Sequence, residues 1–229
     1  MSRLHRYLIV VAGGKGLRMG APVPKQFLPL EGKPLIFHTL NKFIDYDPGM
    51  EIILVLPGGS ESRWEELCKQ YGFNHDHKII EGGDERYDSV KNGLSMIRQK
   101  SLVAVHDAVR PLVSTGTIDR CFTMAAQKGN AVPFVIPSES VREITANDSN
   151  RPLMRERIAL IQTPQVFRSD ILLAAYAQAY NPSFTDDASV VEAAGHKINL
   201  VEGNPENIKI THAKDLEIAN AIRRMNYEL

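Results

Sequence analysis

A glycine-rich segment near the amino terminus combines small residues with two cationic side chains. Residues 11–20 read Val-Ala-Gly-Gly-Lys-Gly-Leu-Arg-Met-Gly and follow the first apolar run of the chain. Glycines let a backbone approach a polyphosphate closely, and Lys15 and Arg18 supply positive charge beside it. The segment has neither the ending of a Walker A loop nor the Gly-x-Gly-x-x-Gly pattern of a dinucleotide site. From this spacing alone, an ordinary glycine-rich turn is the alternative interpretation.

Three further segments carry polar residues that suit a phosphate-handling site. Pro24 precedes Lys25, and its rigid ring presents this lysine close to the glycine-rich segment; a solvated surface lysine is the alternative. Residues 82–90 read Gly-Gly-Asp-Glu-Arg-Tyr-Asp-Ser-Val, and residues 105–111 read Val-His-Asp-Ala-Val-Arg-Pro. Each of these two segments follows an apolar run. We find no convincing Ser-His-Asp or Cys-His set for nucleophilic catalysis.

The elements that must position these side chains alternate along the first part of the chain. Short apolar runs cover residues 7–12, 51–56, 78–81, 102–106 and 131–136, and helix-like segments cover residues 34–45, 60–71, 86–98 and 115–128. This alternation predicts a Rossmann-like three-layer α/β sandwich with a mostly parallel sheet. Ligands bind such sheets at the carboxyl ends of the strands, which is where the polar segments fall.

A polar stretch interrupts this alternation at about residues 137–158. The run Asn-Asp-Ser-Asn at residues 147–150, between residues 141–144 and 154–158, predicts a protruding β-arm. Beyond the arm we expect helices at residues 169–179 and 186–194, strands at residues 197–201 and 207–210, and a last helix capped by Thr211. We therefore expect a single domain over residues 1–229 with the arm inserted in it.

Composition excludes several classes of protein. Lys plus Arg and Asp plus Glu both number 27, so the chain lacks the net positive charge typical of nucleic-acid binding, and we expect no nucleic-acid partner. Two cysteines, Cys68 and Cys121, are too few for a disulfide framework or a zinc site, which favours a reducing compartment. No apolar stretch reaches the length of a membrane helix. We expect a cytoplasmic protein without a membrane partner.

Some residues that resemble metal or catalytic sites have simpler interpretations. His75-Asp76-His77 lies in a polar loop with no third ligand nearby, so a solvated turn is favoured over a metal site. His106, at a strand end, is favoured as a buried, hydrogen-bonded histidine. Asp186-Asp187 could bind a metal, but Thr185-Asp186 ahead of an apolar helix is favoured as an N-cap, with Thr185 also reaching a ligand.

The ordered motifs resemble those of a known enzyme family. Ala-Gly-x-x-Gly-x-Arg-Met followed by Pro-Lys is similar to the signature of sugar-phosphate nucleotidyltransferases. Together with residues 82–90, 105–111, 162–167, 185–189 and 207–211, it resembles the 2-C-methyl-D-erythritol 4-phosphate cytidylyltransferase family from residue 7 to residue 225. The resemblance implies transfer of CMP from CTP to that sugar-alcohol phosphate with release of pyrophosphate, in non-mevalonate isoprenoid biosynthesis, with Mg²⁺ as cofactor.

The resemblance also implies roles for individual residues. The catalytic cations would be Arg18, Lys25, Arg155 and Lys209, the last two holding the second substrate. Asp107 would lie near the Mg²⁺ as its ligand. The residues implied to hold CTP are Ala12, Gly13, Gly14, Gly16, Gly82, Asp84 and Ser89, and those implied to hold the second substrate include Arg110 and Thr185. Asp107, Ala108 and Ser140 complete the implied substrate-binding set. Because Ser140 would serve the site of a neighbouring subunit, the resemblance implies a homodimer joined through the arm.

The sequence departs from the family pattern in the arm. Where the family commonly has Asp-Thr, this chain has Glu139-Ser140, which keeps the hydroxyl group. The family's Leu-Trp is replaced by Ile-Ala at residues 158–159, and Arg157 competes with Arg155 for one role. Two alternatives stay open: a ribitol 5-phosphate cytidylyltransferase, and a module that senses CTP without turning it over.

The implied reaction sets physical demands of its own. The attacking group would be a phosphate monoester, whose second pKa is about 6, so it is already a nucleophile at neutral pH and needs no general base. Two anions must be brought together while negative charge builds up on the α-phosphate and on the leaving pyrophosphate. Positioning and positive charge are therefore the expected means of catalysis.

Overall fold

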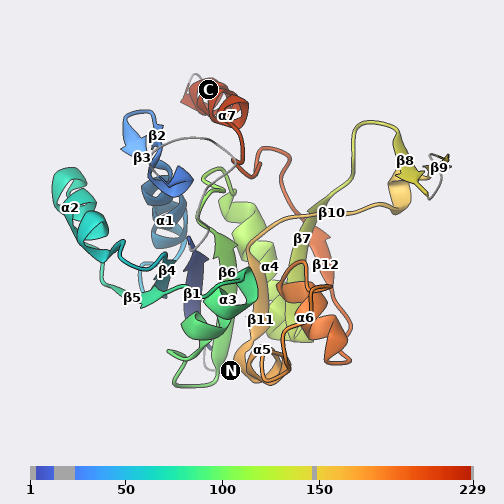
Figure 1. Ribbon diagram of the computed structural model, residues 1–229, viewed down its shortest axis with the longest axis horizontal. Helices are drawn as coiled ribbons and strands as arrows, with labels where there is room; N and C mark the ends of the chain where they lie inside the picture. The colour runs from blue at the N-terminus through green and yellow to red at the C-terminus, as the bar shows by residue number, and fades with distance from the viewer. Residues whose placement is uncertain (1–3, 13–23, 146–148, 228–229) are drawn as a thin grey trace.

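The computed structural model describes residues 4–12, 24–145 and 149–227, and in this part of the chain eight strands form one sheet (Figure 1). The strands lie in the order β10-β7-β11-β6-β1-β4-β5, and β12 pairs with β7. They are β1 (His5–Val11), β4 (Glu51–Leu56), β5 (His77–Glu81), β6 (Ser101–Asp107), β7 (Asn130–Val135), β10 (Leu160–Ile161), β11 (Gln165–Arg168) and β12 (Leu200–Glu202). The predicted α/β class is confirmed.

The centre of the sheet is parallel. β1 pairs in parallel with β4 and β6, and β4 pairs in parallel with β5. The side chains of β4 and β6 are buried on both faces almost throughout, which explains why these segments are apolar runs rather than alternating patterns. β11 runs antiparallel to both β6 and β7, and β10 runs antiparallel to β7. The predicted mostly parallel sheet is therefore confirmed, with antiparallel strands on one side.

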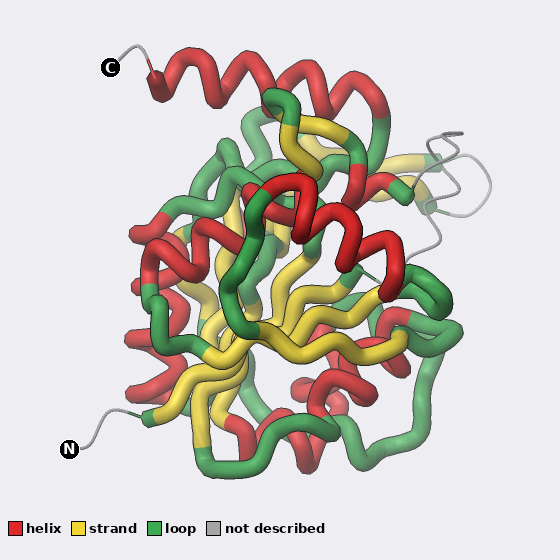
Figure 2. The backbone as a smooth tube through the Cα atoms, turned by 90° about the vertical axis from the view of Figure 1, so that its left-hand side faces the viewer, coloured by secondary structure: helices red, strands yellow, loops and turns green. Residues whose placement is uncertain are grey.

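Helices cover both faces of the sheet, as Figure 2 shows. One face is covered by α1, α2 and α4, which bury Trp64 and Phe122 against it. The other face is covered by α3, α5 and α6, which bury Val90 and Leu172. The bounds are α1 (Leu35–Tyr46), α2 (Glu61–Tyr71), α3 (Arg86–Leu94), α4 (Thr115–Lys128), α5 (Ser169–Ala175) and α6 (Asp187–Ala193). This is the three-layer arrangement that the alternating pattern predicts.

The last helix, α7 (Ala213–Tyr227), lies over one end of the sheet beside a short hairpin of β2 (Pro29–Leu30) and β3 (Lys33–Pro34) (Figures 1 and 2). Ala219 is buried there against Leu30. Thr211 was predicted to cap α7 as a hydrogen-bond acceptor, and this prediction is wrong. The amide and hydroxyl of Thr211 instead donate to the carboxylate of Asp215, at 2.8 and 2.9 Å.

The arm is a two-stranded sheet of β8 (Val141–Ile144) and β9 (Asn150–Leu153), which projects from the main body (Figure 1). The predicted first strand is confirmed, but the predicted return strand at residues 154–158 is wrong. The amide of Thr145 donates to the carbonyl of Ser149 at 2.9 Å, so the turn closes early and pairing resumes at Asn150. Residues 155–157 form a 3₁₀ turn, η3 (Arg155–Arg157).

Other differences concern the ends of elements. The helix predicted to end at residue 98 ends at Leu94, where tighter i→i+3 bonds take over, and the helix predicted to reach residue 179 ends at Ala175. The strand predicted at residues 197–201 is β12, from Leu200 to Glu202. Residues 207–210 were predicted as a strand but form none. The amide of Ile210 donates to the carbonyl of Val109 at 3.0 Å, and no strand ladder continues from this bond.

Candidate functional site

The carboxyl ends of the parallel strands are level with one another. The pairing places Val11 opposite Val55 and Asp107, and the ladder continues one residue further. The amide of Ala12 donates to the carbonyl of Val55 at 2.8 Å, and the amide of Ala108 donates to the carbonyl of Val11 at 3.1 Å. The amide of Gly82 donates to Leu56 at 2.8 Å. The segments that the sequence analysis singled out therefore begin at one edge of the sheet.

The loop after β5 is folded tightly onto the first turn of α3. The amide of Gly83 donates to Oγ of the buried Ser89 at 3.2 Å, and a Cβ at residue 83 would lie 2.3 Å from the Cβ of Asp88. Only glycine fits at that point. Glu85 is the N-cap of α3 and forms a capping box with Asp88, and Asp84 is exposed just before it. The predicted nucleotide-binding residues of this loop thus share one rigid turn.

Asp107, the last residue of β6, lies among three cations. Its Oδ2 is 3.0 Å from Nζ of Lys209 and 3.3 Å from Nε of Arg110, and its Oδ1 is 3.7 Å from Nε of Arg86. Burial would raise the pKa of Asp107, but the charges of Lys209, Arg86 and Arg110 outweigh it and hold that pKa well below its usual range. The carboxylate is therefore ionised throughout the physiological range of pH.

His106 is a structural neighbour of Asp107 rather than a proton carrier. Its Nε2 lies 3.2 Å from the carbonyl oxygen of Arg110, which only accepts, so Nε2 carries the proton. Nδ1 then accepts from the hydroxyl of Thr163 at 3.0 Å, and that hydroxyl accepts from the amide of Asp107 at 3.1 Å. Burial lowers the pKa of His106 to about 4, in agreement with this neutral ring. The preferred sequence interpretation of His106 is confirmed.

The segment that carries Lys209 is tied to the loop after β6. Nη1 of Arg110 donates to the carbonyl of Asn207 at 2.7 Å, and the buried side-chain amide of Asn207 donates to the carbonyl of Thr163 at 2.8 Å. These bonds hold the backbone two residues before Lys209 against the site. The structure therefore brings Asp107, Arg110 and Lys209 together, as the resemblance implies.

The start of α6 forms the other side of this region. Asp186 is the N-cap, its Oδ1 accepting from the amide of Ser189 at 2.9 Å, and the amide of the exposed Thr185 donates to Oγ of Ser189 at 3.0 Å. The cap interpretation is confirmed for Asp186. Asp187 is fully buried, and Arg86 donates to both of its carboxylate oxygens at 3.0 and 2.7 Å.

Three residues of this region received no role from the sequence alone. Arg86 and Thr163 stand inside the motifs quoted above, and Asp187 follows the predicted cap. In the structure Asp187 is the buried partner of Arg86. A signal for Arg86 was present, since an arginine that opens a helix directly after a glycine-rich turn at a strand end faces the site edge.

The amino-terminal loop lies largely outside the described residues. Gly13, Gly14, Gly16 and Arg18 belong to this part, so the predictions for them have no structural counterpart. Lys25 begins a 3₁₀ turn, η2 (Lys25–Phe27), and is half-buried. The side-chain amide of the next residue, Gln26, donates to the carbonyl of Ala12 at 2.9 Å, which fixes this turn to the base of the loop.

Ser140 and Arg155 belong to the arm. Ser140 directly precedes β8, Arg155 follows β9, and both side chains are exposed. Nη1 of Arg155 donates to the carbonyl of Ser138 at 2.7 Å, across the base of the hairpin that Figure 1 shows apart from the main sheet. Within this one chain they lie with the arm rather than with the cluster around Asp107.

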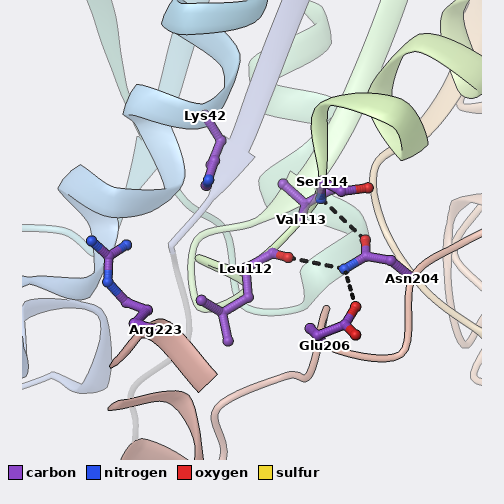
Figure 3. Close-up of a pocket in the computed structure, with 7 residues that line it drawn as sticks. All are labelled: Lys42, Leu112, Val113, Ser114, Asn204, Glu206 and Arg223. Carbon is purple, nitrogen blue, oxygen red and sulfur yellow. Dashed lines mark hydrogen bonds between the residues drawn. The ribbon is translucent and has the colours of Figure 1, made fainter. Parts of the chain in front are cut away.

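A cavity of about 390 Å³ lies between α1, α7 and the segments that precede α4 and follow β12 (Figure 3). In Figure 3, Lys42 on α1 and Arg223 on α7 lie on one side of the cavity, and Val113 and Ser114 lie on the other. The side-chain amide of Asn204 donates to the carbonyl of Leu112 and to the carboxylate of Glu206, at 3.1 Å each. The residues that line it are Lys42, Leu112, Val113, Ser114, Asn204, Glu206 and Arg223. None of the predicted site residues is among them.

The described residues contain no group of three His, Cys, Asp or Glu side chains that is arranged to hold a metal ion. His77 of the His75-Asp76-His77 motif accepts instead from the indole of Trp64 at 2.7 Å. Burial raises the pKa of the thiols of Cys68 and Cys121 to about 11 and about 12, so neither is reactive. In the described parts of the chain, no helix combines the length and apolarity needed to cross a bilayer.

Comparison with known proteins identifies the family. The family model of 2-C-methyl-D-erythritol 4-phosphate cytidylyltransferase matches residues 7–225. Relatives of that name are 52% identical over 222 residues in Azobacteroides pseudotrichonymphae (95% of this chain, 98% of theirs) and 49% identical over 217 residues in Bacteroides fragilis (95% and 99%).

Solved structures agree with the sequence relatives. The crystal structure of 2-C-methyl-D-erythritol 4-phosphate cytidylyltransferase from Thermus thermophilus is 31% identical, with a TM-score of 0.78 over 96% of this chain and 100% of that one. A 4-diphosphocytidyl-2C-methyl-D-erythritol synthase from Anaerococcus prevotii is 25% identical, with a TM-score of 0.82 over 96% and 99%. This chain belongs to the 2-C-methyl-D-erythritol 4-phosphate cytidylyltransferase family.

Proposed function

We propose that the protein transfers CMP from CTP to 2-C-methyl-D-erythritol 4-phosphate, giving 4-diphosphocytidyl-2-C-methyl-D-erythritol and pyrophosphate. The family match over residues 7–225 carries this proposal. The cluster of Lys209, Arg110 and Arg86 around Asp107 at the carboxyl end of β6 supports it, because the reaction brings two anions together.

The chain's own residues suit an in-line displacement. An oxygen of the sugar-alcohol phosphate forms a bond to the α-phosphorus of CTP, the bond from that phosphorus to the bridging oxygen breaks, and pyrophosphate leaves. The described site holds no ionisable group poised as a general base, since His106 is neutral and both of its nitrogens are engaged. We assign Lys25 to the α-phosphate and Lys209 and Arg110 to the incoming phosphate.

We propose Asp107 as the protein ligand of Mg²⁺. Proteins usually bind Mg²⁺ through one or two carboxylates together with substrate phosphates, so a single ionised carboxylate suits this metal. The low pKa of Asp107 supports the assignment, as does its Oδ1, which lies 3.7 Å from Nε of Arg86, longer than a hydrogen bond. When bound, the metal supplies positive charge to the triphosphate. Lys209 and Arg110 neutralise the same carboxylate when the site holds no nucleotide.

We also propose a homodimer joined through the arm. The described part of the chain exposes ten large hydrophobic side chains, and five of them fall within residues 136–161. They are Ile136, Ile144, Met154, Leu160 and Ile161. Exposed apolar side chains gathered on and beside an arm that projects from its own domain are typical of a protein–protein interface. This arrangement would carry Ser140 and Arg155 to the site of the partner subunit.

A pyrophosphate-release assay tests the proposed function. CTP is offered with 2-C-methyl-D-erythritol 4-phosphate in one reaction and with ribitol 5-phosphate in another. A third reaction contains CTP and no acceptor. Release only with the first acceptor is the expected result. Turnover of ribitol 5-phosphate alone would favour the other cytidylyltransferase. Binding of CTP without release of pyrophosphate in either reaction would favour a module that senses CTP without turning it over.

A further inference from the structure

Arg86 opens α3 and makes contacts with two carboxylates that belong to different elements. Its Nη1 and Nη2 donate to the two oxygens of Asp187, at the start of α6, at 3.0 and 2.7 Å. Its Nε lies 3.7 Å from Oδ1 of Asp107, at the end of β6. One guanidinium therefore joins α3, α6 and β6 at the edge of the sheet where the site lies.

The contacts with Asp187 are short and largely shielded from water, whereas the contact with Asp107 is a longer ion pair. Asp187 is fully buried, and the hydroxyl of Tyr176 also donates to its Oδ1 at 2.6 Å. Burial alone would lower the pKa of Arg86, but the charges of Asp187 and Asp107 raise it above its ordinary value. A buried carboxylate needs such partners, because an unpaired charge in the interior is strongly unfavourable. This ion pair therefore ties the start of α6 to the start of α3.

Each of the joined elements carries a different part of the proposed site. The turn at the start of α3 holds Ser89 against Gly83, on the side assigned to CTP. The turn at the start of α6 holds Thr185 through Ser189, on the side assigned to the sugar-alcohol phosphate. Asp107 lies between them. The planar fork of arginine suits three contacts in fixed directions, which a lysine ammonium cannot reproduce.

We propose that Arg86 is a positioning residue that fixes the CTP side and the sugar-phosphate side of the site relative to each other through Asp187 and Asp107. This inference rests on the proposed function. Arg86 itself needs no contact with either substrate. Without Arg86, the start of α6 would be displaced together with Thr185. The turn at the start of α3, which is assigned to CTP, would lose its link to α6 and β6.

The test is steady-state kinetics on Arg86→Lys, which keeps the charge and loses the fork. We expect the KM for each substrate to rise about tenfold and kcat to fall, since a charge-assisted pair is lost at both sides of the site. A KM does not depend on the fraction of folded enzyme, so a purely structural role would leave both KM values unchanged. Wild-type KM values for both substrates would overturn the proposal.

Two further variants keep the test decisive if Arg86→Lys does not fold. Tyr176→Phe removes one hydrogen bond from Asp187 and keeps the ring that stacks on Tyr87, with centroids 4.8 Å apart. We expect the KM for the sugar-alcohol phosphate to rise several-fold. The matched control is Arg168→Lys, because Arg168 pairs with Asp170 on the exposed surface and should leave all constants unchanged. An unchanged KM in Tyr176→Phe contradicts the proposal.

A double-mutant cycle separates positioning from independent damage. If Arg86 acts through Asp187, the effects of Arg86→Lys and Asp187→Asn on the KM values should not multiply in the double variant. Fully multiplicative effects would show that the two residues act separately. Failure of the proposed function can be told apart from failure of this inference. In the first case the wild-type protein itself would release no pyrophosphate with 2-C-methyl-D-erythritol 4-phosphate under the same conditions.

Discussion

The ammonium group of Lys209 lies 3.0 Å from Oδ2 of Asp107, which links the last part of the chain to the end of β6. The side chain of Lys209 is 41% exposed, whereas that of Asp107 is 9% exposed. The lysine can therefore turn toward an incoming anion, while the carboxylate is held in place. We therefore expect Lys209 to exchange Asp107 for a substrate phosphate, as its proposed role requires.

Replacing Lys209 by alanine should weaken binding of the sugar-alcohol phosphate most. Losing one charge-assisted contact corresponds to about 1.5 to 3 kcal/mol, so its KM should rise roughly ten- to hundredfold. The KM for CTP should change little. Steady-state kinetics with each substrate varied in turn measures both, and Lys69→Ala on the exposed surface of α2 is the control. If Lys209→Ala keeps the wild-type KM and turnover, the assignment of this segment to the site is wrong.

Lys25 should behave differently, because we assign it to charge that develops on the α-phosphate only in the transition state. Lys25→Met should lower kcat and kcat/KM together, by about a hundredfold or more, as for other preorganised donors. Binding of CTP, measured by calorimetry, should stay close to wild type. A variant with normal kcat and weakened CTP binding would instead show that Lys25 grips the ground state.

The central parallel strands were predictable because burial on both faces leaves a direct mark on the sequence, and most of the helices were predictable from their place between those strands. β4 was predicted with its observed bounds, since its apolar run coincides with the buried part of the strand. The turn of the arm was not, because residues 147–150 are all common in turns and only the bond from Thr145 to Ser149 decides where pairing resumes. Element ends depend on such single contacts.

The site was predictable only as far as its residues stand in local motifs. Asp107 and Arg110 follow one strand, so their proximity could be inferred from position alone. The partnership of Arg86 with Asp187 spans 101 residues and arises from the packing of α3 beside α6, which no local pattern encodes. His106 shows the opposite case, because burial at a strand end was sufficient to favour a structural role over a catalytic one.

Placing a charge at an exposed apolar position of the arm should separate the proposed homodimer. Ile144 is 85% exposed in β8, so Ile144→Asp should leave the fold of one chain intact and disfavour an apolar contact between two. We expect a lower molecular mass in sedimentation and a loss of activity, because Ser140 and Arg155 would no longer reach a partner's site. Leu173→Asp, at an exposed position on α5, is the control. A fully active monomeric variant would contradict the arm assignment.

The stability of the protein should fall between pH 6.5 and pH 4 because of His106. Burial lowers the pKa of this side chain from 6.5 to about 4, so in that interval the unfolded chain binds a proton that the folded chain does not. The contribution of the neutral His106 to the free energy of unfolding is therefore fully present above pH 6.5. It is lost as the pH falls toward 4, which lowers the free energy of unfolding by about 3 kcal/mol. Asp107 contributes little to the change above pH 4.5, because its carboxylate is ionised in the fold and its ordinary pKa of 3.8 keeps it mostly ionised in the unfolded chain as well. Urea unfolding at pH 7.5 and pH 4.5 should show a smaller loss for His106→Gln than for the wild type, and an equal loss in both would refute the buried neutral histidine.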